Sequence, residues 1–167
     1  MRTLFTGGAL AVVVVSLVAC SGSNAKSASE QAMQHDTDLL AIDRIEKNFH
    51  KATSTQDVDL MMSLFASSAT LTLPTGKTFT GDGQIRRFWR LEAPQFQPEN
   101  RWLSDTSAYK IRITANGDRG TLYFECHYID VKTRKVVAIA AGDMEVARIN
   151  GRWLITNTVG ASTTLSR

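Results

Sequence analysis

Hydrophobic residues recur at helical spacing in the first half of the chain. The clearest run is Leu39, Ile42, Ile45, Phe49 and Ala52. This spacing predicts an amphipathic helix that begins at Asp36 or Asp38 and ends near Thr53. A second, shorter helix is expected after the capping residue Asp57, and a third over about residues 84–92. The first half is therefore expected to be mostly helical.

Apolar and polar residues alternate in the later segments, with the period of half-buried strands. Residues 69–73 alternate in this way, and a short hairpin with residues 78–80 is predicted. Further along, Asn116-Gly117 suits the positive φ angles of a tight hairpin turn. If these two residues form the loop, Ile111 pairs with Leu122. The order of segments, helices first and a long antiparallel meander after them, indicates an α+β fold.

A second Asn-Gly pair, Asn150-Gly151, predicts the last hairpin. The same counting pairs Met144 with Asn157. Both registers together place one set of residues on the inward face of the sheet, and a slip of one residue would mix this set with polar residues. The set is Tyr109, Ile111, Leu122, Phe124, Cys126, Tyr128, Met144, Val146, Trp153, Ile155, Asn157 and Val159.

The N-terminus has the pattern of a secretory signal. Residues 1–19 carry one basic residue, Arg2, followed by an apolar run that is too short to span a bilayer. Leu17-Val18-Ala19-Cys20 resembles a bacterial lipobox. In a lipobox the cysteine sulfur receives a diacylglycerol, and cleavage before the cysteine makes this residue the new N-terminus. This resemblance implies a lipid anchor at Cys20 on the extracytoplasmic side, in the outer membrane if the organism has one. The Ser- and Ala-rich residues 20–34 are interpreted as a flexible tether, followed by one domain over 35–165.

Charge and cysteine content narrow the function classes. The formal net charge is +3 over 167 residues, and the basic residues are scattered, which argues against a nucleic-acid partner. With Cys20 acylated, Cys126 is the only remaining thiol, so no internal disulfide is expected. The domain must then be stabilised by a packed core.

Three features in this order resemble the nuclear-transport-factor-2-like (NTF2-like) superfamily, especially its SnoaL-like branch. They are the amphipathic first helix, the run DVDLMMSLFASSATL from Asp57 to Leu71 that leads to a Pro-x-Gly turn, and the terminal hairpin NGRWLI from Asn150 to Ile155. The resemblance implies a cone in which a curved antiparallel sheet wraps around the N-terminal helices and leaves a pocket between them. It does not identify a reaction, because this fold serves cyclases, isomerases, dehydratases and proteins that only bind.

The inward set predicts the pocket and its chemistry. Its lining is expected to include Tyr109, Phe124, Cys126, Tyr128, Trp153 and Asn157. These residues supply hydroxyls, an amide and a thiol but no carboxylate or imidazole to act as a base, so no catalytic residue is assigned. His127, Glu125 and Asp143 fall on the outward face, where they fit either a solvated surface or a homodimer contact. No metal site or cofactor is expected, because no histidine has a partner at ligand spacing.

Two function classes follow from this pocket. The first is a membrane-anchored module that binds a small apolar ligand or another protein. The alternative is an isomerase, cyclase or dehydratase of the SnoaL-like type that acts on a small carbonyl compound. An acid or histidine inside the cone would favour the enzyme, whereas a filled core would indicate a purely structural envelope protein.

Overall fold

The computed structural model describes residues 26–93, 110–129 and 132–165. Three helices and six strands follow the order expected from the sequence. They are α1 (Ala28–Thr55), α2 (Val58–Met62), β1 (Phe65–Thr72), β2 (Thr78–Thr80), α3 (Gly81–Leu91), β3 (Lys110–Asn116), β4 (Arg119–Ile129), β5 (Val136–Ile149) and β6 (Arg152–Leu165).

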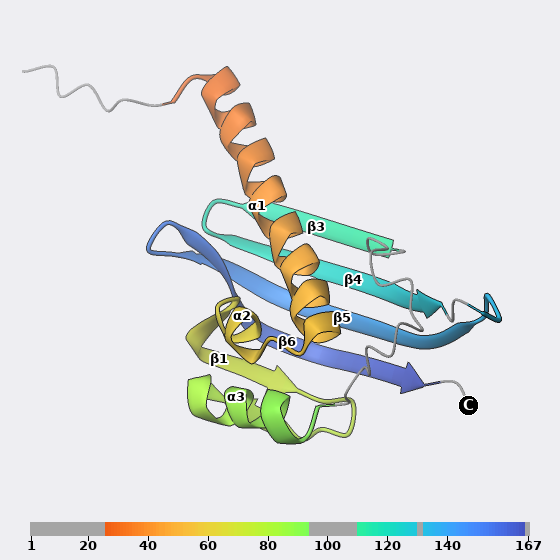
Figure 1. Ribbon diagram of the computed structural model, residues 1–167. Coiled ribbons are helices and arrows are strands. Elements are labelled where there is room, and N and C mark those ends of the chain that lie inside the picture. The colour runs from red at the N-terminus through yellow and green to blue at the C-terminus, as the bar shows by residue number, and fades with distance from the viewer. Residues whose placement is uncertain (1–25, 94–109, 130–131, 166–167) are drawn as a thin grey trace, which may run out of the picture.

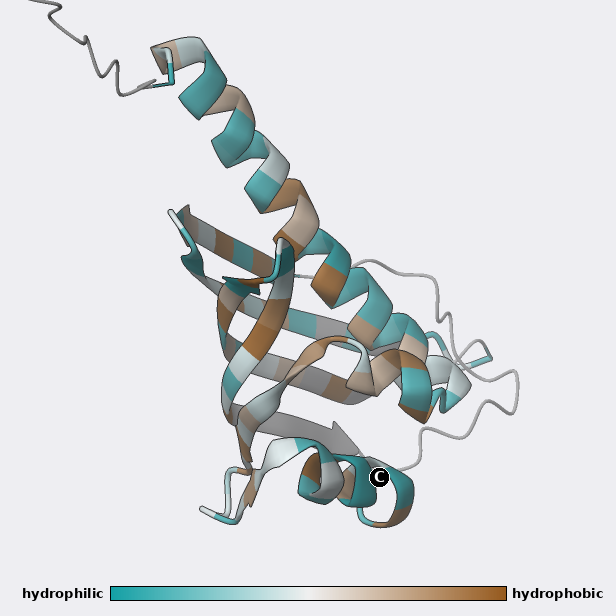
Figure 2. Cartoon of the chain, turned by 90° about the vertical axis from the view of Figure 1, so that its left-hand side faces the viewer, coloured by the Kyte–Doolittle hydropathy of each residue, from teal (hydrophilic) through white to brown (hydrophobic). Residues whose placement is uncertain are grey.

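One curved, unclosed sheet forms the wall of a cone. Its strand order is β2-β1-β6-β5-β4-β3. Neighbouring strands run antiparallel except β1 and β6, which pair in parallel. The helices lie on one side of this sheet, and Figure 2 shows the sheet curving around them. The predicted α+β cone is confirmed, with the parallel β1–β6 pair as the departure from a purely antiparallel sheet.

Helix α1 begins earlier than the hydrophobic spacing predicts. It starts at Ala28, inside the segment interpreted as a tether, because Ser27 and Glu30 form a capping box. The Glu30 amide donates to Ser27 Oγ at 3.3 Å, and the Ser27 amide donates to Glu30 Oε2 at 2.7 Å. The first turns of α1 project beyond the sheet (Figure 1). No helix within the described residues is both long and apolar enough to cross a membrane.

The pairing register of the β3–β4 hairpin is shifted by two residues from the predicted register. The loop is Gly117 and Asp118, so Ile111 pairs with Phe124 rather than with Leu122. Gly117 takes the left-handed φ of 60°, whereas Asn116 remains in β3. The predicted pairing was wrong, but an even shift keeps each side chain on the same face. Leu122 and Phe124 therefore still point inward.

The β5–β6 hairpin follows the prediction near its turn and then departs from it. Asn150 and Gly151 have φ values of 50° and 77°, and Val146 pairs with Ile155 as expected. The register then shifts, so that Glu145 pairs with Asn157, and Thr156 is the extra residue of a β-bulge. Thr156 Oγ1 donates to the Glu145 carbonyl oxygen at 3.2 Å.

This bulge exchanges the two faces of β6 beyond it. Thr158, paired with Met144, is fully buried, whereas Val159 is 54% exposed. Asn157 is only partly buried and shares the outer face with Glu145. The predicted inward positions of Asn157 and Val159 were wrong, because a bulge adds one residue to one strand and alternation restarts from it.

The hydrophobic core lies between α1, α3 and the concave face of the sheet. Ile42 of α1 lies against Gly120 of β4, where a Cβ would come within 3.2 Å of Ile42 Cδ1. About two turns further along α1, Phe49 packs on Phe124 with ring centroids 5.2 Å apart. These two contacts show which face of α1 points into the cone.

Candidate ligand site in the cone

The structure describes only some of the predicted pocket residues. Phe124 and Trp153 are buried on the concave face, with 2% and 8% of their surface exposed. Cys126 and Tyr128 belong to β4, but their side chains lie outside what the structure describes, as do Tyr109 and the anchor residue Cys20. The pocket formed by these residues stays a prediction.

Trp153 uses its polar edge to hold α1 at the rim of the cone. Its indole Nε1 donates to Asp38 Oδ1 at 3.2 Å, and the Arg148 guanidinium lies 5.1 Å from the ring centroid. Asp38, 6% exposed, also accepts from Gln34 at 3.0 Å and forms an ion pair with Arg148. Arg148 in turn lies 3.1 Å from Asp118. This group, called the rim cluster below, consists of Gln34, Asp38, Asp118, Arg148 and Trp153.

The rim cluster stabilises the charged form of its central carboxyl group. Burial by itself raises the pKa of Asp38, since a carboxylate loses hydration there. Hydrogen bonds from Trp153, Gln34 and Arg148, together with the positive charge of Arg148, outweigh burial and leave the pKa below its usual value. Asp38 is thus a fixed anion with its acceptors occupied, which suits a structural role.

Aromatic rings line the interior between α1, α3 and β4. Phe49 packs edge-on against Trp89 with centroids 5.5 Å apart, and Trp89 packs in the same way against Phe88 at 5.1 Å. Phe49 also contacts Phe124, which joins α3 to the sheet through α1. The buried Nε1 of Trp89 has no hydrogen-bond partner among the described residues. Such a group calls for an explanation, because buried donors are nearly always paired.

A second buried polar group without a described partner is Thr158 on β6. Its side chain is 0% exposed between Leu71 of β1 and Met144 of β5, and its Oγ1 makes no hydrogen bond within the described part of the chain. The sequence pattern assigned this face to Asn157, so Thr158 was not predicted. Only the bulge at Thr156 brings its hydroxyl inside.

The interior also contains a carboxyl group, although none was expected in the predicted pocket lining. Glu46 of α1 is 1% exposed. It lies one turn after Ile42 and just under one turn before Phe49, so it shares their inward face. Ile42 lies at Gly120 and Phe49 at Phe124, so this face of α1 packs against β4. The sequence analysis favoured a solvated helix face for Glu46, and its burial shows that this interpretation was wrong.

Polar residues gather on the outer face of the sheet, where they were predicted. Glu125 accepts from His127 Nε2 at 2.6 Å, Tyr123 Oη at 3.1 Å and Lys110 Nζ at 3.2 Å. The His127 bond first, with the Lys110 and Tyr123 bonds and the Lys110 charge, lowers the pKa of Glu125 despite burial. Asp143 lies on the same outer face, as expected, and pairs with Tyr123. The homodimer contact suggested for this face stays a prediction.

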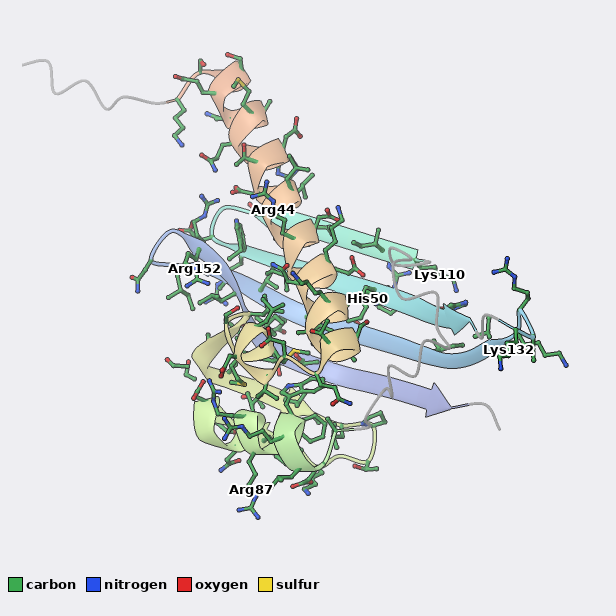
Figure 3. All side chains as sticks on the ribbon, in the orientation of Figure 1. Arg44, His50, Arg87, Lys110, Lys132 and Arg152 are labelled. Atoms are coloured by element: carbon green, nitrogen blue, oxygen red, sulfur yellow. The ribbon has the colours of Figure 1, made fainter. Side chains whose placement is uncertain are left out.

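Asn157 borders an open hollow of about 460 Å³ on the outer face. The hollow is lined by Asp118, Arg119, Glu145, Ala147, Arg148, Thr156 and Asn157. The basic side chains labelled in Figure 3 are distributed over helices α1 and α3, strands β3 and β6 and the turn before β5 rather than collected in one patch. Within the described ranges, no group of three or more His, Cys, Asp or Glu residues could hold a metal ion.

Comparisons with known proteins agree with this architecture. The SnoaL-like domain family matches residues 34–159. An NTF2-like protein of unknown function from Pseudomonas putida KT2440 superimposes with a TM-score of 0.59 at 11% identity, covering 74% of this chain and 84% of that one. A ketosteroid isomerase-like protein from Erwinia carotovora atroseptica superimposes with a TM-score of 0.53 at 15% identity, covering 72% and 92%. No curated protein matches the chain. At these identities, the solved structures establish the fold alone.

Proposed function

Because the chain belongs to the SnoaL-like domain family, we propose that it is a lipid-anchored envelope protein whose cone binds a small, largely apolar molecule. The observation that carries the binding role is the pair of buried polar groups, Trp89 Nε1 and Thr158 Oγ1, beside an aromatic interior. Ligand sites combine such apolar walls with a few placed polar groups.

The anchor is supported by the sequence around Cys20 and by the start of α1. The lipobox-like tetrapeptide precedes a short polar run, and the capping box then begins a helix whose first turns project away from the sheet. Acyl chains contribute about 0.8 kcal/mol for each buried methylene, and more than one chain gives stable attachment. A helix that starts soon after the anchor would hold the cone away from the bilayer.

The anchor is tested by Cys20→Ser in cell fractionation. The expected result is release from the membrane fraction, or accumulation of an uncut precursor, because the serine hydroxyl is not lipidated. Substitution of Ser21 by Ala serves as the matched control and should leave the protein in membranes. Normal cutting and full membrane retention of the Cys20→Ser protein would contradict the anchor.

The binding role is tested by thermal unfolding with small aromatic probes. Ligands that bind only the folded state raise the melting temperature in proportion to occupancy. We expect Thr158→Val, which keeps the shape of the side chain and removes its hydroxyl, to reduce the shift produced by probes that can hydrogen-bond. Asn157→Leu, on the outer face, should leave all shifts unchanged. If no probe shifts the wild-type protein, the ligand-binding proposal fails.

A second candidate is acid–base catalysis of the isomerase, cyclase or dehydratase type on a small carbonyl compound. Glu46 favours it, since a carboxyl group inside the cone can move a proton next to a carbonyl. Its direct test is exchange of the α-hydrogens of cyclohexanone for deuterium, followed by NMR. Enzyme-dependent exchange that Glu46→Gln abolishes would establish it, and exchange equal to the buffer rate would exclude it for this substrate class.

A further inference from the structure

We infer that the hollow on the outer face of the sheet binds a small zwitterion, an amino acid or a dipeptide. In this site Arg119 holds the carboxylate of the ligand, and Glu145 holds its ammonium group. The hollow lies outside the cone, so the inference goes beyond the proposed function and does not depend on it.

The hollow forms where a small residue and a bulge interrupt the outer face. Ala147 of β5 pairs with Arg119 of β4 on one side and with Leu154 of β6 on the other. Its methyl group leaves space between longer side chains, and the bulge at Thr156 borders this space. The described helices all lie on the opposite side of the sheet (Figure 2). A volume of about 460 Å³ is within the range of small-molecule sites.

Four charged side chains line the hollow, and two of them are already paired. Asp118 lies 3.1 Å from Arg148, which also forms an ion pair with Asp38. Arg119 and Glu145 are exposed, and neither has an ion-pair partner within the described part of the chain. Among the described lining residues, this leaves one guanidinium and one carboxylate available to a ligand.

The strand register explains how one molecule can contact both charges. Arg119 pairs with Ala147, and Glu145 precedes Ala147 by two residues on β5. Such diagonal neighbours on one face of a sheet lie about 7–8 Å apart, within reach of long side chains. The two charged groups nevertheless do not pair with each other, and both border the hollow. A molecule placed between them can bridge the two.

The charges select a zwitterion and fix its orientation. A guanidinium group donates two parallel hydrogen bonds to a carboxylate, whereas an ionised glutamate only accepts and suits an ammonium group. A simple anion would be attracted by Arg119 but repelled by Glu145, and a simple cation would meet the reverse. Only a ligand with both groups is attracted at both ends.

The test is a titration of the full ¹⁵N-labelled chain, kept unacylated by Cys20→Ser, with L-alanine and with L-alanyl-L-alanine. NMR spectra follow the backbone amides of Ala147, Thr156 and Asn157, which line the hollow. We expect saturable shifts of these amides, and the tighter of the two ligands identifies the preferred length. N-acetyl-L-alanine lacks the ammonium group and L-alaninamide lacks the carboxylate. Each should bind about fivefold more weakly than L-alanine, the effect of one exposed charge pair.

Substitutions then assign each end of the ligand to one side chain. Arg119→Gln should weaken L-alanine about fivefold and remove its advantage over L-alaninamide. Glu145→Gln should have a similar effect and remove the advantage over N-acetyl-L-alanine instead. Arg112→Gln and Asp143→Asn are the matched controls, since they remove the same charges from the same face outside the hollow. They should leave both advantages unchanged.

Three results would overturn the inference. The first is the absence of saturable shifts at the hollow with either ligand. The second is equal binding of L-alanine and its two blocked forms, or equal weakening by the control variants, which would indicate only general surface charge. The third is shifts confined to the cone, at Leu122 and Phe124, which would support the proposed function and exclude the hollow. Thermal unfolding with aromatic probes tests the cone separately.

Discussion

Two carboxyl groups on α1, those of Asp38 and Glu46, are both buried, but they lie at different positions along the cone. Asp38 lies at the rim, where an indole, an amide and a guanidinium from three elements hold it as an anion. Glu46 lies two turns further into the cone, on the face that carries Ile42 and Phe49. Burial is nearly equal, at 6% and 1% exposed, so burial alone does not separate their roles.

The difference is in what surrounds each carboxyl group. In the rim cluster, Trp153 and Arg148 hold Asp38 and with it α1 against β5 and β6, and removing Asp38 would leave the indole N–H of the buried Trp153 without its acceptor. Glu46 lies instead on a helix face whose other members, Ile42 and Phe49, belong to the apolar core. The rim position is typical of a structural group, whereas a carboxyl group inside the cone is a candidate for function.

The largest expected effect tests the rim. Asp38→Asn should lower the free energy of unfolding by about 2 kcal/mol, because it removes the charge that pairs with Arg148 and one acceptor of the cluster. The value lies below that of a fully buried pair, since the Arg148 side chain is 24% exposed. Urea unfolding measures it, and Asp36→Asn, two residues away on the exposed side, is the control. Equal stabilities of the two variants would contradict a structural role for Asp38.

A smaller change in stability is expected when the pH is lowered. The pKa of Asp38 is lower in the folded than in the unfolded chain, so this group stabilises the fold above its unfolded pKa of about 3.9. That contribution is lost as the pH falls through the lower, folded pKa. The stability gap between wild type and Asp38→Asn should therefore be constant near neutral pH and shrink below about pH 4. A gap that persists unchanged at low pH would show that charge is not what Asp38 contributes.

The smallest expected effect tests the interior. Glu46→Leu should lower the free energy of unfolding by less than about 1 kcal/mol, since the apolar neighbours Ile42 and Phe49 can pack against a leucine of similar volume. Urea unfolding next to Asp38→Asn measures the contrast. A loss above about 2 kcal/mol would place Glu46 in the same structural class as Asp38.

Much of the fold was predictable because it depends on local patterns. The spacing of Ile42, Ile45 and Phe49 indicated α1, and Asn150-Gly151 indicated the last hairpin with its register near the turn. The candidate site was less predictable. Phe124 and Trp153 are buried on the concave face as expected, but Glu46 was assigned to a solvated helix face although it shares the helical face of Ile42.

The sequence by itself determined the order of elements, the inward face of α1 and the faces of β4, because each follows from a repeat of 3.6 or two residues. Tertiary structure decided the rest. The bulge at Thr156 arises where β6 must pair with β5 on one side and β1 on the other, and it turns Thr158 inward and Asn157 outward. The surroundings of Asp38 and Glu46 were decided in the same way, since residues far apart in the sequence supply them.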